Sequence, residues 1–120
     1  MTIKDAITRV DMTKPNQFGP AIKITWLSEL DGKIFEEIFK THEESPIEKF
    51  EGHTSDADEL LIPFPYDSIY LRWLETKIDY ANGETNKYNV SNILFNSEYS
   101  QMRNHYNRNH NPIGTRIKFF

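Results

Sequence analysis

The stretch KYNVSNILFNSEYSQMRNHYN, residues 87–107, contains the longest periodic pattern in the chain. Side chains suited to a protein interior recur in it at spacings of three or four residues. They are Tyr88, Ser91, Phe95, Tyr99, Met102 and Tyr106. This spacing places all of them on one face of an α-helix. The pattern predicts a helix over about residues 86–107, capped by Thr85 or Asn86, whose inner face packs against other helices.

A second helix is predicted just before it, over about residues 65–82. Pro65 suits the first helical turn because its φ is fixed, and Asp67 suits the positive end of the helix dipole. Gly83 suits the C′ position that ends a helix. The expected core face consists of Ile69, Tyr70, Trp73, Leu74, Ile78 and Ala81.

Two further helices are predicted in the N-terminal third. Thr2 followed by Asp5 has capping-box character and predicts a helix over about residues 2–11. Pro20 suits the first position of a longer helix over about residues 20–42. The apolar stripe of this longer helix is Ile22, Trp26, Leu27, Leu30, Ile34, Phe35, Ile38 and Phe39.

Residues 43–63 are rich in acidic residues and are predicted to form a loop. Two short strands, near residues 47–51 and 59–62, are one interpretation of this stretch, and an irregular loop is the other. Pro112 and Gly114 exclude a helix in residues 109–120, which are predicted to be an extended C-terminal arm. The fold expected is therefore mainly α: one domain, residues 1–120, containing a small bundle of about four helices.

Charge is unevenly distributed along the chain. Residues 29–59 contain eleven acidic and three basic residues, a net charge of −8, whereas residues 101–120 contain four basic residues and no acidic one. On opposite sides of the fold, such segments would favour head-to-tail contacts between copies; otherwise both are solvated surfaces. The arm either packs on its own core or docks on a neighbour. The expected interface residues are Arg103, Arg108, Ile113, Arg116, Ile117, Lys118, Phe119, Phe120, Glu43, Glu44, Asp56 and Asp58.

Several function classes lack their sequence signatures. The chain has no cysteine, no glycine-rich phosphate loop, no nucleophile elbow and no long apolar run, so we expect no enzyme, cofactor or membrane segment. A net charge of −4 does not favour a general nucleic-acid binder. The histidines and carboxylates of residues 42–58 match neither HExxH nor an EF-hand, and are interpreted as an acidic loop without a metal.

Several blocks together resemble a family of small proteins encoded in the head-to-tail morphogenesis region of tailed phages and prophages of Gram-positive gut bacteria. The blocks are residues 26–32 (WLSELDG), 59–67 (ELLIPFPYD), 70–75 (YLRWLE), 78–84 (IDYANGE), 87–89 (KYN) and 106–112 (YNRNHNP). LLIPFPYD and IDYANGE are the most specific. None of them is a catalytic signature.

The resemblance implies a head-tail connector, also called an adaptor or neck protein. Such a protein forms a ring, commonly of twelve copies, on the portal at the capsid vertex and docks the next neck or tail protein. DNA passes through its channel without sequence-specific binding, and no cofactor is needed. The expected location is the head-tail junction of the virion, and the host cytoplasm during assembly. The alternative is a small phage regulatory or nucleic-acid-binding protein that uses Arg103 to Lys118.

Overall fold

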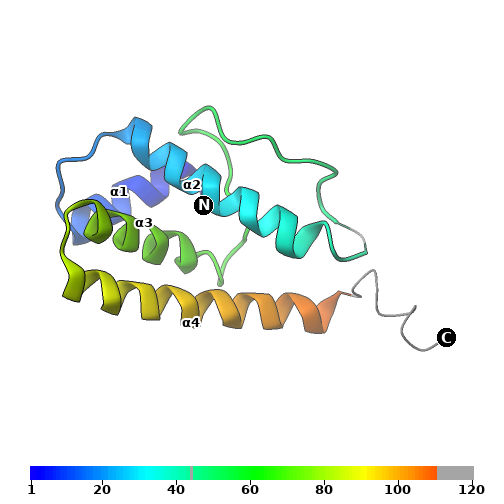
Figure 1. Ribbon diagram of the computed structural model, residues 1–120. Helices are drawn as coiled ribbons and strands as arrows, with labels where there is room; N and C mark the ends of the chain where they lie inside the picture. Colours follow the sequence, from blue (N-terminus) through cyan, green and yellow to red (C-terminus); the bar gives the residue numbers. More distant parts are fainter. Residues whose placement is uncertain (44, 111–120) are drawn as a thin grey trace.

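The protein is mainly helical, as expected. The computed structural model describes residues 1–43 and 45–110. They form α1 (Ile3–Thr13), α2 (Pro20–Ile34), α3 (Ser68–Ala81) and α4 (Thr85–Asn109), with a π-helical segment, η1 (Phe35–Phe39), directly after α2. In Figure 1, α4 runs along the lower edge, with α3 above it, α2 above α3 and α1 behind. A small helical bundle is therefore confirmed.

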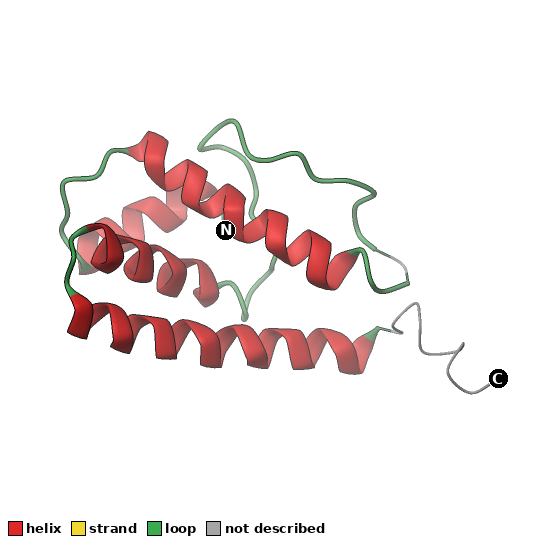
Figure 2. Cartoon of the chain, in the orientation of Figure 1, coloured by secondary structure: helices red, strands yellow, loops and turns green. Residues whose placement is uncertain are grey.

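The interpretation of residues 47–51 and 59–62 as paired strands is wrong. The described part of the segment is an irregular loop, and its one ladder contact is an isolated bridge between Glu59 and Thr2 (Figure 2). The backbone N–H groups of Ile3 and Lys4 donate to the carbonyls of Asp58 and Asp56 at 3.0 and 2.8 Å. The loop thus satisfies N–H groups that the first turn of α1 leaves without helical partners.

α3 and α4 form an antiparallel hairpin around Gly83. The N–H of Gly83 donates to the Tyr80 carbonyl at 3.1 Å, and that of Glu84 to the Asp79 carbonyl at 3.0 Å. These two bonds make a Schellman motif, and its C′ residue, Gly83, has a φ of +70°. The predicted helix stop is confirmed. The predicted cap of α4 is not, because Glu84 takes the N-cap position and its side chain makes no capping bond.

The long helix predicted over residues 20–42 is interrupted. The α-helix ends at Ile34, and the Lys40 N–H donates to the Phe35 carbonyl at 2.8 Å, five residues back. Such a wide turn brings Phe35, Ile38 and Phe39 to the same buried side. The helical path thereby keeps its apolar side chains in the core up to the point where the acidic loop begins.

The core lies where α1, α2, α3 and η1 meet, and α4 covers it along one side. The capping box of Thr2 and Asp5 is present, and the α1 side chains of Ile3, Ala6 and Val10 are buried. Some predicted core positions differ. Ile22 and Ala81 are exposed, and the half-buried ones are Trp73, Tyr88, Ser91 and Tyr106. Residues that are fully or almost fully buried include Leu27, Leu30, Ile34, Ile38, Ile69, Tyr70, Leu74 and Ile78.

Candidate interaction surfaces

A buried polar cluster fixes the acidic loop to the bundle. Asp31 of α2 is fully buried, and its carboxylate accepts hydrogen bonds from the Tyr70 hydroxyl at 2.6 Å and the Leu61 N–H at 3.1 Å. His53 Nε2 lies 2.6 Å from the same carboxylate. The Tyr70 hydroxyl also accepts the Ile62 N–H at 2.8 Å. Burial, with Asp31 beside it, holds the pKa of Tyr70 well above its usual range.

The polar groups of this cluster bond one another and hold the loop on the bundle. Both ring nitrogens of His53 face carboxylates, Asp31 at 2.6 Å and Asp58 at 3.6 Å, and its side chain is almost entirely buried. The Ser28 hydroxyl accepts a hydrogen bond from the backbone N–H of His53 at 2.9 Å and does not bond to the His53 ring. A hydroxyl activated by an imidazole, as in acyl transfer, is therefore not assembled here.

Two more buried charges tie the helices together. Asp79 of α3 is fully buried and accepts bonds from Lys14 Nζ and the Ser91 hydroxyl, both at 2.7 Å. Lys23 of α2 is also buried, and its Nζ donates to Asp11 Oδ1 and to the Phe18 carbonyl, both at 2.7 Å. Every one of these charges has a close partner, as buried charges require.

The two histidines of residues 42–58, which the sequence analysis placed in an acidic loop, both have structural hydrogen-bond partners. His42 is buried at the end of η1, where Nδ1 lies 2.5 Å from the Ile38 carbonyl and Nε2 lies 2.7 Å from Asn107 Oδ1 of α4. His53 is held by Asp31, as described above. Among residues 1–43 and 45–110, no group of three His, Cys, Asp or Glu side chains is placed to hold a metal ion.

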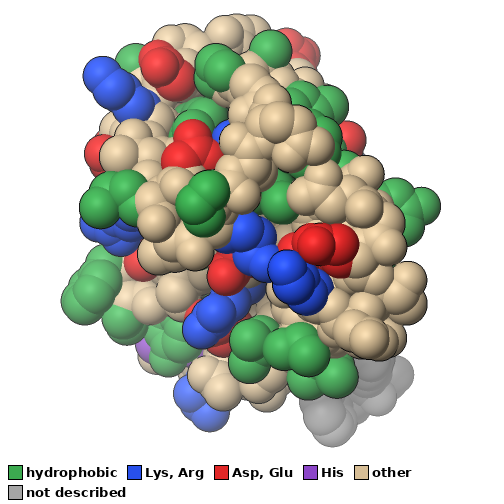
Figure 3. Space-filling model, turned by 90° about the vertical axis from the view of Figure 1, so that its left-hand side faces the viewer, with side chains coloured by type: hydrophobic (Ala, Val, Ile, Leu, Met, Phe, Trp, Pro, Cys, Tyr) green, Lys and Arg blue, Asp and Glu red, His purple; other side chains and the backbone are tan. Residues whose placement is uncertain are grey.

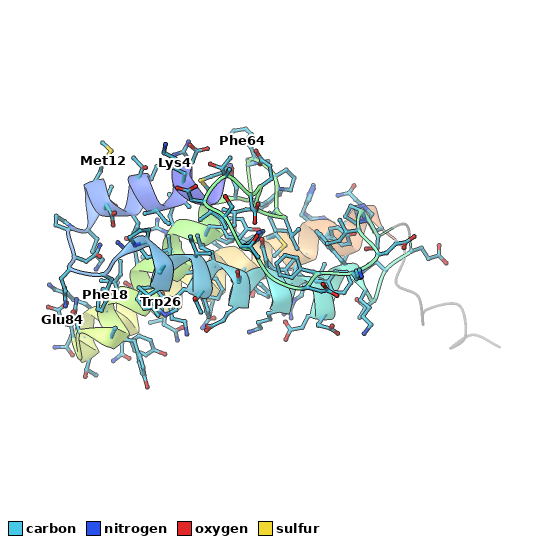
Figure 4. The ribbon with its side chains drawn as sticks, turned by 90° about the horizontal axis from the view of Figure 1, so that it is seen from above. Lys4, Met12, Phe18, Trp26, Phe64 and Glu84 are labelled. Atoms are coloured by element: carbon cyan, nitrogen blue, oxygen red, sulfur yellow. The ribbon has the colours of Figure 1, made fainter. Side chains whose placement is uncertain are left out.

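An open apolar groove lies at the C-terminal end of α4. Its volume is about 340 Å³, and its walls come from the loop before α3 and the last turns of α4. Phe64, at its rim, is 84% exposed. In Figure 4 Phe64 projects outward along the same edge of the molecule as Lys4 and Met12 of α1. Sequence reasoning missed the groove, because PFPY was considered only as an entry to a helix.

The outward face of α4 has almost no charge. From Tyr88 to Met102 the only charged side chain is Glu98, and it is occupied by Arg72 Nε at 2.5 Å and the Ser68 hydroxyl. On the solvent side, Val90, Ile93 and Leu94 are 60, 67 and 41% exposed. The other exposed positions between Tyr88 and Met102 are all uncharged: Asn89, Asn96, Ser97, Ser100 and Gln101. A scarcity of charged residues around exposed apolar side chains is typical of the centre of a protein interface.

The end of the bundle at which α3 turns into α4 has a different surface. In Figure 3, which views this end, hydrophobic side chains alternate with Lys, Arg, Asp and Glu. The exposed Tyr80 packs there against Tyr88, with ring centroids 5.6 Å apart. Exposed apolar side chains among charges are common on monomeric proteins, so this end is a weaker candidate than the α4 face.

The expected interface residues that the structure describes differ in exposure and in role. Arg103 and Arg108 are exposed on α4, Asp56 is exposed on the loop, and Glu43 is half-buried. Asp58 serves the loop itself, because its carboxylate accepts the N–H groups of Thr54 and Ser55 at 3.0 and 3.3 Å. These bonds lower the pKa of Asp58. The other predicted interface residues lie outside the described residues: Glu44, Ile113, Arg116, Ile117, Lys118, Phe119 and Phe120.

The acidic segment, residues 29–59, and the described part of the basic segment, residues 101–110, lie next to each other. The Tyr99 hydroxyl donates to Glu37 at 3.0 Å, while the Arg103 guanidinium lies over the Tyr99 ring, 5.9 Å from its centre. His42 and Asn107 join the same two segments. Burial and the bond to Glu37 raise the pKa of Tyr99. Here the acidic and basic segments are adjacent, so the opposite-face arrangement considered for head-to-tail contacts is not present at this point.

Comparison with protein-family models, with curated proteins and with solved structures finds no match to this chain. Within the part of the chain that the structure describes, no helix is long and apolar enough to cross a membrane. What the described residues define is a fold class: a small helical bundle, with an open apolar groove at one end and exposed apolar side chains on α4.

Proposed function

We propose that this protein is a structural virion component, a head-to-tail connector subunit that assembles as a ring on the portal and docks neck or tail proteins. The observation that supports this best is the uncharged outer face of α4, with Val90, Ile93 and Leu94 exposed at its centre. The resemblance in the ELLIPFPYD and IDYANGE blocks supplies the specific assignment. The mechanism is the formation of interfaces, without the making or breaking of bonds.

The composition of the α4 face explains why it suits a partner better than water. Charged residues make up 27% of the chain, yet one side of a long helix is nearly without them. Removing a charged side chain from water at an interface is costly unless it is paired, whereas Val, Ile and Leu gain roughly 25 cal/mol per Å² buried. Copies that pack through this face would therefore remove few charged side chains from water while burying apolar area.

The surroundings of such a ring are consistent with the charge of the chain. A channel that passes DNA without holding it favours a protein that is not strongly basic, and the net charge here is −4. The subunit would act at the head-tail junction of the virion, and in the host cytoplasm while the particle assembles.

The test compares assembly with nucleic-acid binding. Purified protein is imaged by negative stain and weighed by mass photometry, alone at high concentration and with the portal of the same phage. The proposal expects closed rings, or rings capping the portal. A gel shift with random-sequence duplex DNA at physiological salt is run in parallel. Salt-dependent DNA binding, without rings in either condition, would contradict the proposal and favour the alternative, a regulatory or nucleic-acid-binding protein that uses Arg103 to Lys118.

A further inference from the structure

Two hollows lie next to each other on the hairpin of α3 and α4, at the opposite end of the bundle from the apolar groove (Figure 1). Their volumes are about 310 and 150 Å³. Tyr80 and Tyr88 line both hollows, and their ring centroids lie 5.6 Å apart with the ring planes at 59°. Trp73 adds a third ring to the smaller hollow. The hollows therefore share an aromatic wall, and Tyr80, which is 70% exposed, is open to a ligand.

Neutral polar side chains surround these rings. Thr85 and Asn89 line the larger hollow, and Asn92 lines the smaller one. Within residues 1–43 and 45–110, the side-chain amides of Asn89 and Asn92 and the hydroxyls of Tyr80 and Tyr88 make no hydrogen bond. An amide both donates and accepts, and so does a phenol. The hollows thus combine aromatic faces with neutral donors and acceptors.

The charged side chains at the two hollows have partners of opposite sign. Lys77 Nζ lies 3.5 Å from Glu29, and Glu84, labelled in Figure 4, lies 3.3 Å from Lys87 Nζ. Asp79 is fully buried and has the two partners described above. No excess of either sign is left to attract an ionic ligand, because each charge is balanced by its neighbour. Charge complementarity therefore favours a neutral ligand.

A saccharide matches both the rings and the polar groups. A pyranose ring has an apolar face of C–H groups, which packs on an aromatic ring, and an edge of hydroxyl groups, which bond amides and phenols. A purely apolar ligand would bury the amides of Asn89 and Asn92 without partners, which is costly. A nucleotide would bring phosphates to a site whose lysines are already paired. A neutral sugar satisfies the hollows without either cost.

We infer that the two hollows bind a neutral oligosaccharide, with one pyranose ring against Tyr80 and its hydroxyls on Asn89 and Asn92. Two adjoining hollows with a common wall accommodate successive sugar units better than a single one. The chemistry is the same for a free oligosaccharide and for a sugar in a surface polymer. The inference does not depend on the proposed function, because sugar binding and ring assembly are measured separately and either one can fail without the other.

Titration of the isotope-labelled full-length protein, followed by the NMR shifts of its backbone amides, tests the inference. The probes are maltotriose and the trisaccharide of N-acetylglucosamine, each compared with its monosaccharide. Tyr80→Ala removes the exposed ring, and Phe64→Ala is the matched control, an exposed aromatic residue at the groove. Asn89→Ala removes an amide, and Asn96→Ala is its control, because both asparagines are exposed on α4 and Asn96 lines neither hollow.

We expect at least one trisaccharide to bind with a Kd on the order of a millimolar or below, and more tightly than its monosaccharide. Tyr80→Ala should weaken binding at least about tenfold and Asn89→Ala about threefold, whereas both controls should stay within about twofold. If Tyr80→Ala fails to fold by circular dichroism, Asn89→Ala and Asn96→Ala decide the outcome.

The absence of saturable shifts around Tyr80 and Tyr88 with both trisaccharides would overturn the inference. So would equal weakening by Tyr80→Ala and Phe64→Ala, because the sugar would then not lie on the hairpin. A single-stranded oligothymidine is titrated in parallel. If it shifts the same amides and neither sugar does, the rings stack on bases, and the saccharide assignment is wrong.

Discussion

The Tyr70 hydroxyl donates a 2.6 Å hydrogen bond to Asp31 Oδ1, although both side chains are fully buried and 39 positions separate them in the sequence. The same hydroxyl accepts the Ile62 N–H, and the same carboxylate accepts the Leu61 N–H. One bond between α2 and α3 thus also holds the end of the acidic loop. The path of the loop, and therefore the position of the groove wall, depends on this pair.

Tyr70→Phe should destabilise the protein by about 1–3 kcal/mol. The substitution keeps the ring but leaves the Ile62 N–H and Asp31 Oδ1 each without one partner in a buried place. The free energy of unfolding is measured by urea titration. Tyr80→Phe, at a position that is 70% exposed, is the matched control and should change it by less than about 0.5 kcal/mol. Equal effects at the two positions would show that the network is not important for stability.

The same tyrosine predicts a dependence on alkaline pH. Burial and the neighbouring Asp31 raise the pKa of Tyr70 in the folded state, while the unfolded chain titrates near 10.0. A raised folded-state pKa contributes stability that is complete below the unfolded pKa and is lost as pH rises above it. The melting temperature of the wild type should therefore fall more steeply above pH 10 than that of Tyr70→Phe. Parallel curves would contradict this.

Local signals predicted the helices well because each depends on a few neighbouring residues. The Thr2–Asp5 capping box and the Gly83 stop need only short-range bonds, and both are present. The π-helical turn at Phe35 was not predictable in this way, because local propensity does not distinguish it from continued α-helix. The loop forms hydrogen bonds with the first turn of α1 instead of a hairpin. Those bonds are tertiary contacts, so local sequence patterns do not predict them.

The buried charges were missed although the sequence contains a signal for them. Asp31 lies four residues after Leu27 and three before Ile34, so it shares their face of α2. Lys23 lies three residues before Trp26 and four before Leu27, so it shares their face as well. A charge within an apolar stripe indicates either a buried polar network or a shifted face. Which of the two applies depends on partners such as His53 and Asp11, which periodicity within one helix does not reveal.

Trp73→Ala should cost about 3 kcal/mol. The indole packs against Phe95 of α4, with ring centroids 5.1 Å apart, and its Nε1–H donates to the Trp26 carbonyl at 2.6 Å. Truncating a buried Trp typically costs 3–5 kcal/mol, and the partial exposure of this one favours the lower end. Denaturant unfolding measures the loss. A cost under about 1 kcal/mol would mean that the indole does not join α2, α3 and α4.

Acid should destabilise the loop through Asp58. The N–H groups of Thr54 and Ser55 hold the pKa of its carboxyl below the usual 3.8. A lowered folded-state pKa contributes stability that is present above the unfolded pKa and is lost as pH falls through the folded value. The melting temperature should therefore drop below about pH 4, and less steeply in Asp58→Asn. Curves of equal slope below pH 4 would show that these bonds do not contribute.

The outer face of α4 makes the most direct prediction about assembly. Ile93→Glu places a charge at the centre of the proposed interface, in a side chain that is 67% exposed, so the fold should survive. Met12→Glu is the matched control, because Met12 is 77% exposed on α1, outside the α4 face. Burying an unpaired carboxylate between subunits costs several kcal/mol, so Ile93→Glu should lower ring formation or portal capture at least about tenfold.

Circular dichroism first establishes that both variants are folded, and mass photometry and portal co-sedimentation then measure assembly. Met12→Glu should match the wild type in both measurements. If Ile93→Glu also matches it, the α4 face is solvent-exposed in the assembled particle, and the groove end of the bundle becomes the surface to mutate next. If both variants lose assembly equally, charge itself opposes association, and the effect does not locate an interface.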